Sequence, residues 1–175
     1  MKRGIDIMFF HRVLACLLLL LVSPILLLAV GLLIIESPRH SPFFKQLRVG
    51  QHGTLFHMYK LRSMRPCSRE EFEELLKKNE CSEVIFKIKK DPRITLVGRV
   101  LRKFSIDELP QLLNVVKGDM ALVGPRPALV REVIQYPANA AKRLEVLPGC
   151  SGLWQISGRS DISFEKMIEL DIHYI

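Results

Sequence analysis

Residues 13–35 read VLACLLLLLVSPILLLAVGLLII, and this run contains no charged side chain. As a straight helix at about 1.5 Å per residue it would be roughly 34 Å long, enough to cross a hydrocarbon core about 30 Å thick. A membrane-inserted segment is therefore the first prediction, and the rest of the fold is expected to be built around it.

The apolar run has a break at its midpoint, Ser23-Pro24. Proline removes one helical hydrogen bond, and a serine just before it can satisfy a freed carbonyl. A cleaved signal peptide is a poor fit, because the run is too long and the flanking Ile35-Glu36-Ser37-Pro38 does not resemble a small-residue cleavage site. A kinked spanning helix and a re-entrant helix that bends at Ser23-Pro24 both remain open.

Basic charge favours the re-entrant alternative. The net charge is +8, and residues 1–62 hold eight basic side chains against two acidic ones, on both flanks of the apolar run. Under the positive-inside rule neither flank is a clear outside end, and a segment that returns to the face it entered removes that conflict. Such charge beside an apolar run indicates anionic lipid headgroups and phosphate ligands. No aromatic-interleaved basic stripe is present, so nucleic acid is not an expected partner.

Beyond the apolar run, the pattern predicts a small single domain of mixed α/β, helix-rich structure. We assign residues 1–40 to a membrane-inserted re-entrant helix and its flanks, and 41–175 to a cytosolic-face catalytic domain with amphipathic interfacial helices. The expected elements are a hairpin or two short strands over 42–64, a helix capped by Ser68 and ending near Asn79, a strand over 84–88, a helix over 107–116 stopped by Gly118, helices over 127–135 and 138–146, a glycine-rich loop over 148–158, and an amphipathic stretch from Ser163 to the end.

Several common sites are absent from the sequence. It has no P-loop, no G-x-G-x-x-G, no H-E-x-x-H and no G-x-S-x-G. The four cysteines form no C-x-x-C pair and are expected to be free thiols, and the five histidines form no pair with metal-ligand spacing.

The strongest candidate for chemistry is Arg102-x-x-Ser105-x-Asp107-Glu108-Leu-Pro110-Gln111. Ser105 and Glu108 have capping-box spacing, so one interpretation is simply a well-capped helix start. The other is catalytic, because a helix N-terminus favours an ionised carboxylate, and aspartate can act as a covalent nucleophile toward phosphorus. A divalent cation could hold Asp107 and a diphosphate together.

Cations in short Gly- or Pro-rich segments, or at the ends of elements, support the catalytic interpretation. Arginine forks suit bidentate phosphate contacts, and lysine acts as a point charge. The candidates are Lys60, Arg62, Arg93, Arg102 and Arg126. Arg126 is the most specific, because Pro125 and Pro127 fix the backbone on both sides of it.

The motifs together resemble the bacterial sugar transferases, also called monotopic phosphoglycosyl transferases. The resemblance lies in Met58-Tyr59-Lys60-Leu61-Arg62-Ser63-Met64, in Asp91-Pro92-Arg93-Ile94-Thr95 through Asp107-Glu108-Leu109-Pro110-Gln111 to Gly124-Pro125-Arg126-Pro127, and in the break at Ser23-Pro24. The later stretch Pro148-Gly149-Cys150-Ser151-Gly152-Leu153-Trp154-Gln155 is similar to the subset that uses hexose substrates and polyprenyl phosphate. The matches follow in order over nearly the whole chain.

The resemblance implies a two-step reaction on the cytoplasmic face of the bacterial inner membrane. Asp107 would attack the sugar-linked phosphate of a UDP-sugar, release UMP and form a phosphosugar-enzyme. Undecaprenyl phosphate would then accept the sugar phosphate, which downstream glycosyltransferases extend in exopolysaccharide, O-antigen or capsule synthesis. The resemblance also implies Mg²⁺ at Asp107, assistance from Glu108, and phosphate or nucleotide contacts from Arg102 and Arg126. Lys60 and Arg62 lie in the upstream motif, and UDP-glucose or UDP-galactose is the favoured donor.

The resemblance leaves two other functions to be tested, a membrane phosphohydrolase and a non-catalytic membrane scaffold. Larger family members carry several membrane helices before the catalytic unit and continue past the motif that ends here at His173-Tyr174-Ile175. On this comparison we expect a shortened form of the family.

Overall fold

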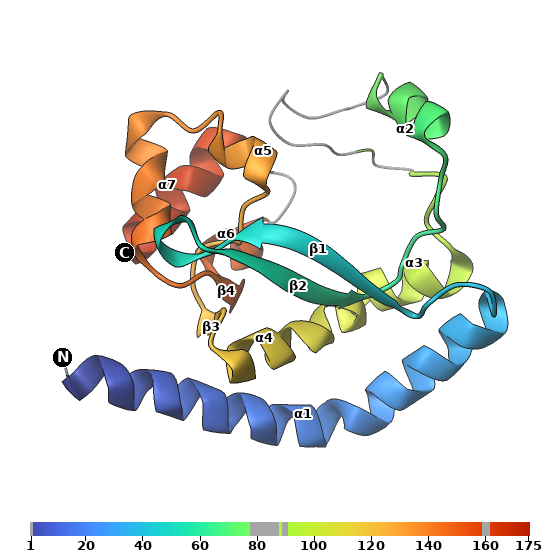
Figure 1. Cartoon of the computed structure of the whole chain (residues 1–175), viewed down its shortest axis with the longest axis horizontal. Coiled ribbons are helices and arrows are strands. Elements are labelled where there is room, and N and C mark those ends of the chain that lie inside the picture. The colour runs from blue at the N-terminus through green and yellow to red at the C-terminus, as the bar shows by residue number, and fades with distance from the viewer. Residues whose placement is uncertain (1, 78–87, 89–90, 159–161) are drawn as a thin grey trace.

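The computed structural model describes residues 2–77, 88, 91–158 and 162–175. A single helix, α1 (Lys2–Glu36), contains the whole apolar run, including Pro24 (Figure 1). The hydroxyl of Ser23 donates to the carbonyl of Leu20 at 2.8 Å. That carbonyl is four residues before Pro24, so the serine satisfies the acceptor that the proline leaves without a partner. The helix consequently continues through the proline, and Figure 1 shows it curved, with both ends turned toward the rest of the protein.

The curved helix lies along the remaining domain over most of its length. Near its start, the His11 Nδ1 accepts a hydrogen bond from the Leu122 backbone at 3.2 Å. At its end, Glu36 accepts one from the Val97 backbone at 3.0 Å. Of the described helices, only α1 is long and apolar enough to cross a membrane. Contacts at both ends are compatible with a segment that enters and leaves one face, and re-entrant insertion itself stays a prediction.

One side of α1 is buried in the protein and the other is exposed. Ala15, Ala29 and Leu33 are buried, whereas large apolar side chains cover the outer side. The exposed set on α1 includes Phe9, Phe10, Leu17, Leu20, Leu21, Leu27, Leu28 and Ile35. An apolar surface of this extent is compatible with insertion into a lipid bilayer.

Topology can be tested by labelling single cysteines at Ile7 and Arg39, which flank the apolar run, in a chain lacking its native cysteines. A re-entrant segment should let a membrane-impermeant maleimide reach both positions from the cytosolic side only. A cysteine at Leu21, which is exposed on the outer side of α1, should label only after detergent is added. Labelling of the two flanks from opposite faces would show that α1 spans the membrane.

The predicted hairpin is confirmed. Strands β1 (Phe43–Val49) and β2 (Leu55–Leu61) pair antiparallel, with Phe43 opposite Leu61, across the short 3-10 turn η1 (Gln51–Gly53). Alternation brings Met58 inward, where it joins a core of Ala15, Phe56, Leu112, Val115 and Met120. Through its apolar face the hairpin therefore packs against α1 and against the helix over Leu112–Lys117.

Between α1 and the hairpin lie α3 (Leu96–Lys103), η2 (Ile106–Gln111) and α4 (Leu112–Lys117). The sequence predicts one α-helix over 107–116. This prediction is wrong for the first part, because residues 106–111 form a 3-10 helix that contains Pro110 and the α-helix begins only at Leu112. Gly118 ends α4 in the left-handed region, at φ 92°, as predicted. A second core of Ala29, Leu33, Leu61 and Leu101 joins α1, β2 and α3.

The C-terminal half is less helical than the sequence predicts. Strand β3 (Ala121–Val123) pairs parallel with β4 (Gly149–Ser151), and α6 (Leu153–Ile156) follows, where a loop over 148–158 is predicted. The helix predicted over 127–135 is wrong in extent: only α5 (Val130–Val133) forms, since the proline-rich turn leads into an extended Leu129. The helix predicted over 138–146 is the 3-10 helix η3 (Ala138–Glu145).

Two capped helices agree with prediction. Ser68 accepts from the Glu71 backbone and begins α2 (Arg69–Leu76), and Ser163 begins α7 (Phe164–Tyr174) in the same way. Cys16, Cys67 and Cys150 are free thiols, as expected. Cys81 and most of the strand predicted over 84–88 lie outside the described residues.

Candidate active site

The Asp107 side chain is buried in the first turn of η2, with 7% of its surface exposed. The hydroxyl of Ser63, two residues past the end of β2, donates to its Oδ2 at 3.3 Å. The carboxylate is therefore held where η2 meets the end of the hairpin.

Burial raises the pKa of Asp107 above its ordinary value. Loss of hydration is the largest cause, and the nearby charge of Glu108 acts in the same direction. Lys60, Arg102 and the Ser63 hydrogen bond oppose it. The sequence predicts a site that favours the ionised form, so the direction found is the reverse of that prediction.

The local backbone also departs from the prediction. Ser105 adopts φ 56° in the left-handed region, and its side chain makes no capping hydrogen bond, so the predicted capping box is wrong. The Ser105 carbonyl instead accepts from the Glu108 backbone at 3.2 Å. At Asp107, burial outweighs the opposing charges of Lys60 and Arg102 and the Ser63 hydrogen bond.

Glu108 forms an ion pair with Lys60, at 2.7 Å between Oε1 and Nζ. Lys60 comes from β2, so the pair joins the hairpin to η2 beside Asp107. Both side chains are partly exposed, at 22% and 43%, so solvent reaches this pair. The two adjacent carboxylates thus differ in environment: Glu108 is paired with Lys60 and partly exposed to solvent, whereas Asp107 is buried.

Arg102, in the last turn of α3, lies close enough to lower the pKa of both Asp107 and Asp91. Asp91 is itself bound by Arg93, at 2.6 Å between Oδ2 and Nη2. Of the sequence candidates, Lys60, Arg102 and Glu108 therefore lie close to the Asp107 carboxylate.

Arg126 lies in a second group of charges. Its guanidinium pairs with the buried Glu132 at 2.9 Å and lies over the ring of Trp154, 6.0 Å from the ring centre. Pro125 is fully buried, and the Pro127 carbonyl accepts from Arg48 at 2.9 Å. The turn is rigidly held, as its prolines suggest.

Arg48 interacts electrostatically with charges of both groups, and the sequence analysis does not single it out as a ligand candidate. It is buried, and burial together with the charge of Arg126 lowers its pKa to about 9, whereas Glu132 and Glu108 act to raise it. Ser63 and Glu132 are also absent from the predicted site. Alternation along β1 gives one usable signal, because Arg48 lies opposite Phe56 and so on the inward face with Met58 and Lys60.

Arg62 has a structural position. Its guanidinium donates to the carbonyls of Ser41 at 3.0 Å and Leu33 at 3.1 Å, and more weakly to Ser37. Leu33 lies in the last turn of α1, and its carbonyl also accepts from the Ser37 backbone at 3.1 Å. Arg62 thus binds the end of α1 to the hairpin, and its predicted substrate contact stays a prediction.

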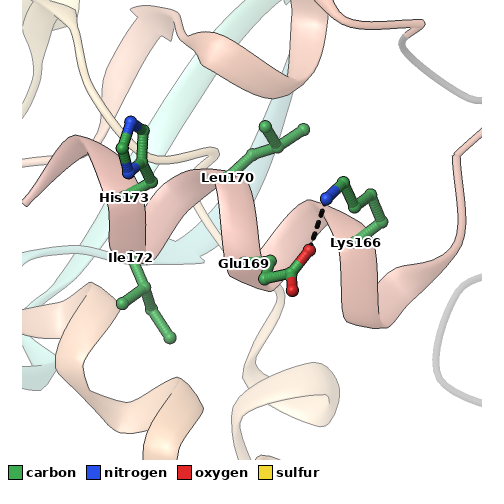
Figure 2. A pocket seen from close by; sticks show the side chains of 5 residues that line it. All are labelled: Lys166, Glu169, Leu170, Ile172 and His173. Carbon is green, nitrogen blue, oxygen red and sulfur yellow. Dashed lines mark hydrogen bonds and ion pairs between the residues drawn. The ribbon is translucent and has the colours of Figure 1, made fainter.

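The acidic residues allow only a modest metal site. Within the described ranges, no group of three His, Cys, Asp or Glu side chains converges. Magnesium is commonly held by one or two carboxylates together with substrate phosphates and water, so Asp107 with a bound diphosphate fits that pattern. A hollow along α7, lined by Lys166, Glu169, Leu170, Ile172 and His173, includes none of the predicted site residues (Figure 2).

The family model for bacterial sugar transferases matches residues 1–175. The chain belongs to the bacterial sugar transferase family. It is 40% identical over 178 residues to the exopolysaccharide production protein ExoY of Sinorhizobium fredii, covering 99% of this chain and 76% of that protein.

Two further relatives are named for galactose transfer. The galactosyl transferase CpsE of Streptococcus agalactiae is 49% identical over 133 residues, which are 75% of this chain and 30% of the relative. The undecaprenyl-phosphate galactose phosphotransferase of Salmonella typhimurium is 49% identical over 132 residues, 73% of this chain and 28% of the relative. The chain thus spans less than a third of these two proteins.

Proposed function

We propose that the chain is a phosphoglycosyl transferase that moves a hexose 1-phosphate from a UDP-sugar to undecaprenyl phosphate. The observation that carries the proposal is the buried Asp107 carboxylate, oriented by Ser63 and flanked by Lys60, Arg102 and Glu108. Relatives named for galactose transfer support a hexose donor, and UDP-glucose or UDP-galactose is favoured. Activity on these substrates is the part that experiment must establish.

The first step requires an ionised Asp107. One carboxylate oxygen attacks the sugar-linked phosphorus, the bond from that phosphorus to the bridging oxygen breaks, and UMP leaves with that oxygen. In the second step an oxygen of the lipid phosphate attacks the same phosphorus, and the Asp107 carboxylate is released. Atoms and charges balance without any further reactant.

The surrounding cations have distinct proposed roles. Arg102 and Arg126 bind phosphate or nucleotide oxygens, since guanidinium forks match their geometry. Lys60 keeps Glu108 in place and counters the negative charge at Asp107. Asp107 together with donor phosphate oxygens would hold Mg²⁺, which would supply neutralisation of negative charge.

The proposed location follows from α1. With its apolar face in the inner membrane, the site would lie at the cytoplasmic surface, within reach of a lipid phosphate and of soluble UDP-sugars. The product would be the first lipid-linked sugar of an exopolysaccharide or related polymer, and downstream glycosyltransferases would use it.

The test is UMP release by the purified chain in lipid nanodiscs, measured against a panel of UDP-sugars with and without undecaprenyl phosphate. Donor labelled in the sugar-linked phosphate should leave label on the protein when the lipid is absent. Release of hexose 1-phosphate to water would instead indicate a phosphohydrolase. No UMP with any donor would indicate a non-catalytic scaffold.

The pH dependence of protein labelling should report the environment of Asp107. Because burial raises its pKa, the acid limb of the labelling rate should lie above the ordinary aspartate value of 3.8. Replacing Lys60 with Met removes a cation that lowers this pKa, so the limb should move to still higher pH. Single-turnover labelling from about pH 4 to pH 8 measures the acid limb of the unmodified chain and that of Lys60→Met.

The matched control for this experiment is Lys166→Met, a cation exposed on α7 whose partner is Glu169. Its acid limb should coincide with that of the unmodified chain. An unchanged limb in Lys60→Met would contradict the electrostatic role assigned to Lys60.

A further inference from the structure

The C-terminal helix α7 contributes a buried charge to the interior. Asp171 pairs with Arg143 of η3 at 2.5 Å between Oδ2 and Nη2, and their side chains are 1% and 2% exposed. A buried ion pair adds little stability over well-packed apolar residues, because both charges lose their hydration. Its presence therefore calls for another explanation.

The guanidinium of Arg143 reaches the turn that carries Arg126. Its Nη2 donates to the Arg126 carbonyl at 3.2 Å, and its Nη1 donates to the Tyr136 hydroxyl at 2.6 Å. Asp171 faces two cationic groups, because the pair partner Arg143 and the side chain of Arg126 both act on its carboxylate. The pair is thus in contact with the backbone of a proposed substrate-binding residue.

The side chain of Arg126 is held separately. Glu132, 1% exposed, accepts from the Arg126 Nη1 at 2.9 Å and also from the Leu129 backbone at 2.8 Å. Glu132 therefore orients the guanidinium, and Arg143 fixes the peptide from which that guanidinium extends. Arg126 is thus restrained at both its guanidinium and its backbone carbonyl.

We propose that Asp171 and Arg143 are positioning residues that set the location of Arg126 for the donor diphosphate. The inference rests on the proposed function. Asp171 holds the planar fork of Arg143 so that one arm contacts Tyr136 and the other the Arg126 carbonyl. Helix α7, which contains none of the predicted site residues, is in this way part of the donor site.

The test is Arg143→Lys, which keeps the charge opposite Asp171 but cannot reproduce the two-armed contact. The KM for UDP-sugar should rise about tenfold, with a smaller change in kcat, because donor binding is weakened before chemistry. Lys142→Met, at an exposed neighbouring position on η3, should leave both constants unchanged.

A second measurement separates positioning from general stability. In an Arg126→Ala background, Arg143→Lys should have no further effect on KM, since it acts through the missing guanidinium. A purely structural pair would give the same fold-change in both backgrounds, and that result would overturn the proposal. If Arg143→Lys does not fold, the apolar pair Arg143→Met with Asp171→Leu takes its place, and it should fold yet keep a raised KM.

The outcomes are distinguishable from failure of the proposed function. If the unmodified chain releases no UMP, the proposed function fails. If the unmodified chain does release UMP, two results overturn the positioning role alone. One is an unchanged KM in both Arg143→Lys and the double variant Arg143→Met with Asp171→Leu, and the other is that neither of them folds.

Discussion

Asp107→Asn is expected to abolish UMP release and protein labelling, with a loss of at least about a thousandfold, because the amide cannot act as the nucleophile. Asparagine has nearly the same size as aspartate, so the Ser63 hydroxyl can still bond to its oxygen. Arg102 and Lys60 stay in place. The loss should therefore fall on the chemical step and leave donor binding largely intact.

Stability gives a second, independent readout of the same variant. Burial raises the pKa of Asp107, so at neutral pH the folded state holds an ionised carboxylate less favourably than the unfolded chain does. Replacing it with a neutral amide removes that penalty, and the melting temperature should stay the same or rise. Loss of activity without loss of stability is the pattern expected of a residue kept for function.

The control is Glu169→Gln, an exposed carboxylate on α7 that is 69% accessible. It should retain full UMP release and labelling. Activity in Asp107→Asn within tenfold of the unmodified chain would remove Asp107 from the role of nucleophile. Labelling that survives in Asp107→Asn, with UMP released in step with it, would place the covalent bond on a different residue.

The parts of the fold that the sequence predicts well are those that depend on local chemistry. Ser68 and Ser163 cap their helices because a serine oxygen needs only the amide three residues later. The hairpin follows from alternation around Gly50 and Gly53, and the helix persists through Pro24 because Ser23 satisfies the freed carbonyl.

The parts that it misses depend on distant segments. Ser105 has the spacing of a capping residue, yet it turns left-handed where α3 gives way to η2 between α1 and the hairpin. Ser63 donates a hydrogen bond to Asp107 only because β2 ends beside η2. Arg62 shows the converse, since a motif arginine that resembles a phosphate ligand is occupied by the carbonyls at the end of α1.

The second large effect is expected at Gly98, which lies in α3 against the backbone of Ser63. A Cβ built on Gly98 would lie 2.0 Å from the Ser63 carbonyl oxygen and 2.6 Å from its carbon. Backbone cannot move aside as a flexible side chain can, so α3 and the end of β2 must separate. Arg102 lies on α3, and Ser63, which donates to Asp107, lies just past the end of β2.

Gly98→Ala should therefore reduce both stability and activity. Overpacking typically costs 1–3 kcal/mol, and a backbone clash belongs at the upper end, so a melting temperature about 6–12 °C lower is expected. UMP release per folded molecule should also fall, because Arg102 moves relative to Asp107. Circular dichroism melts in nanodiscs and UMP release at a temperature where the variant remains folded measure the two effects.

Gly31→Ala provides the matched control, because this glycine lies in α1 and a Cβ there meets nothing within 4 Å. Alanine is about 1 kcal/mol better than glycine in a helix interior, so stability should be unchanged or higher and activity retained. The contrast separates the cost of a side chain from the cost of this particular contact. If Gly98→Ala melts and turns over like Gly31→Ala, α3 is free to shift without disturbing Asp107, and the close fit between α3 and the hairpin is not what aligns Arg102 with the carboxylate.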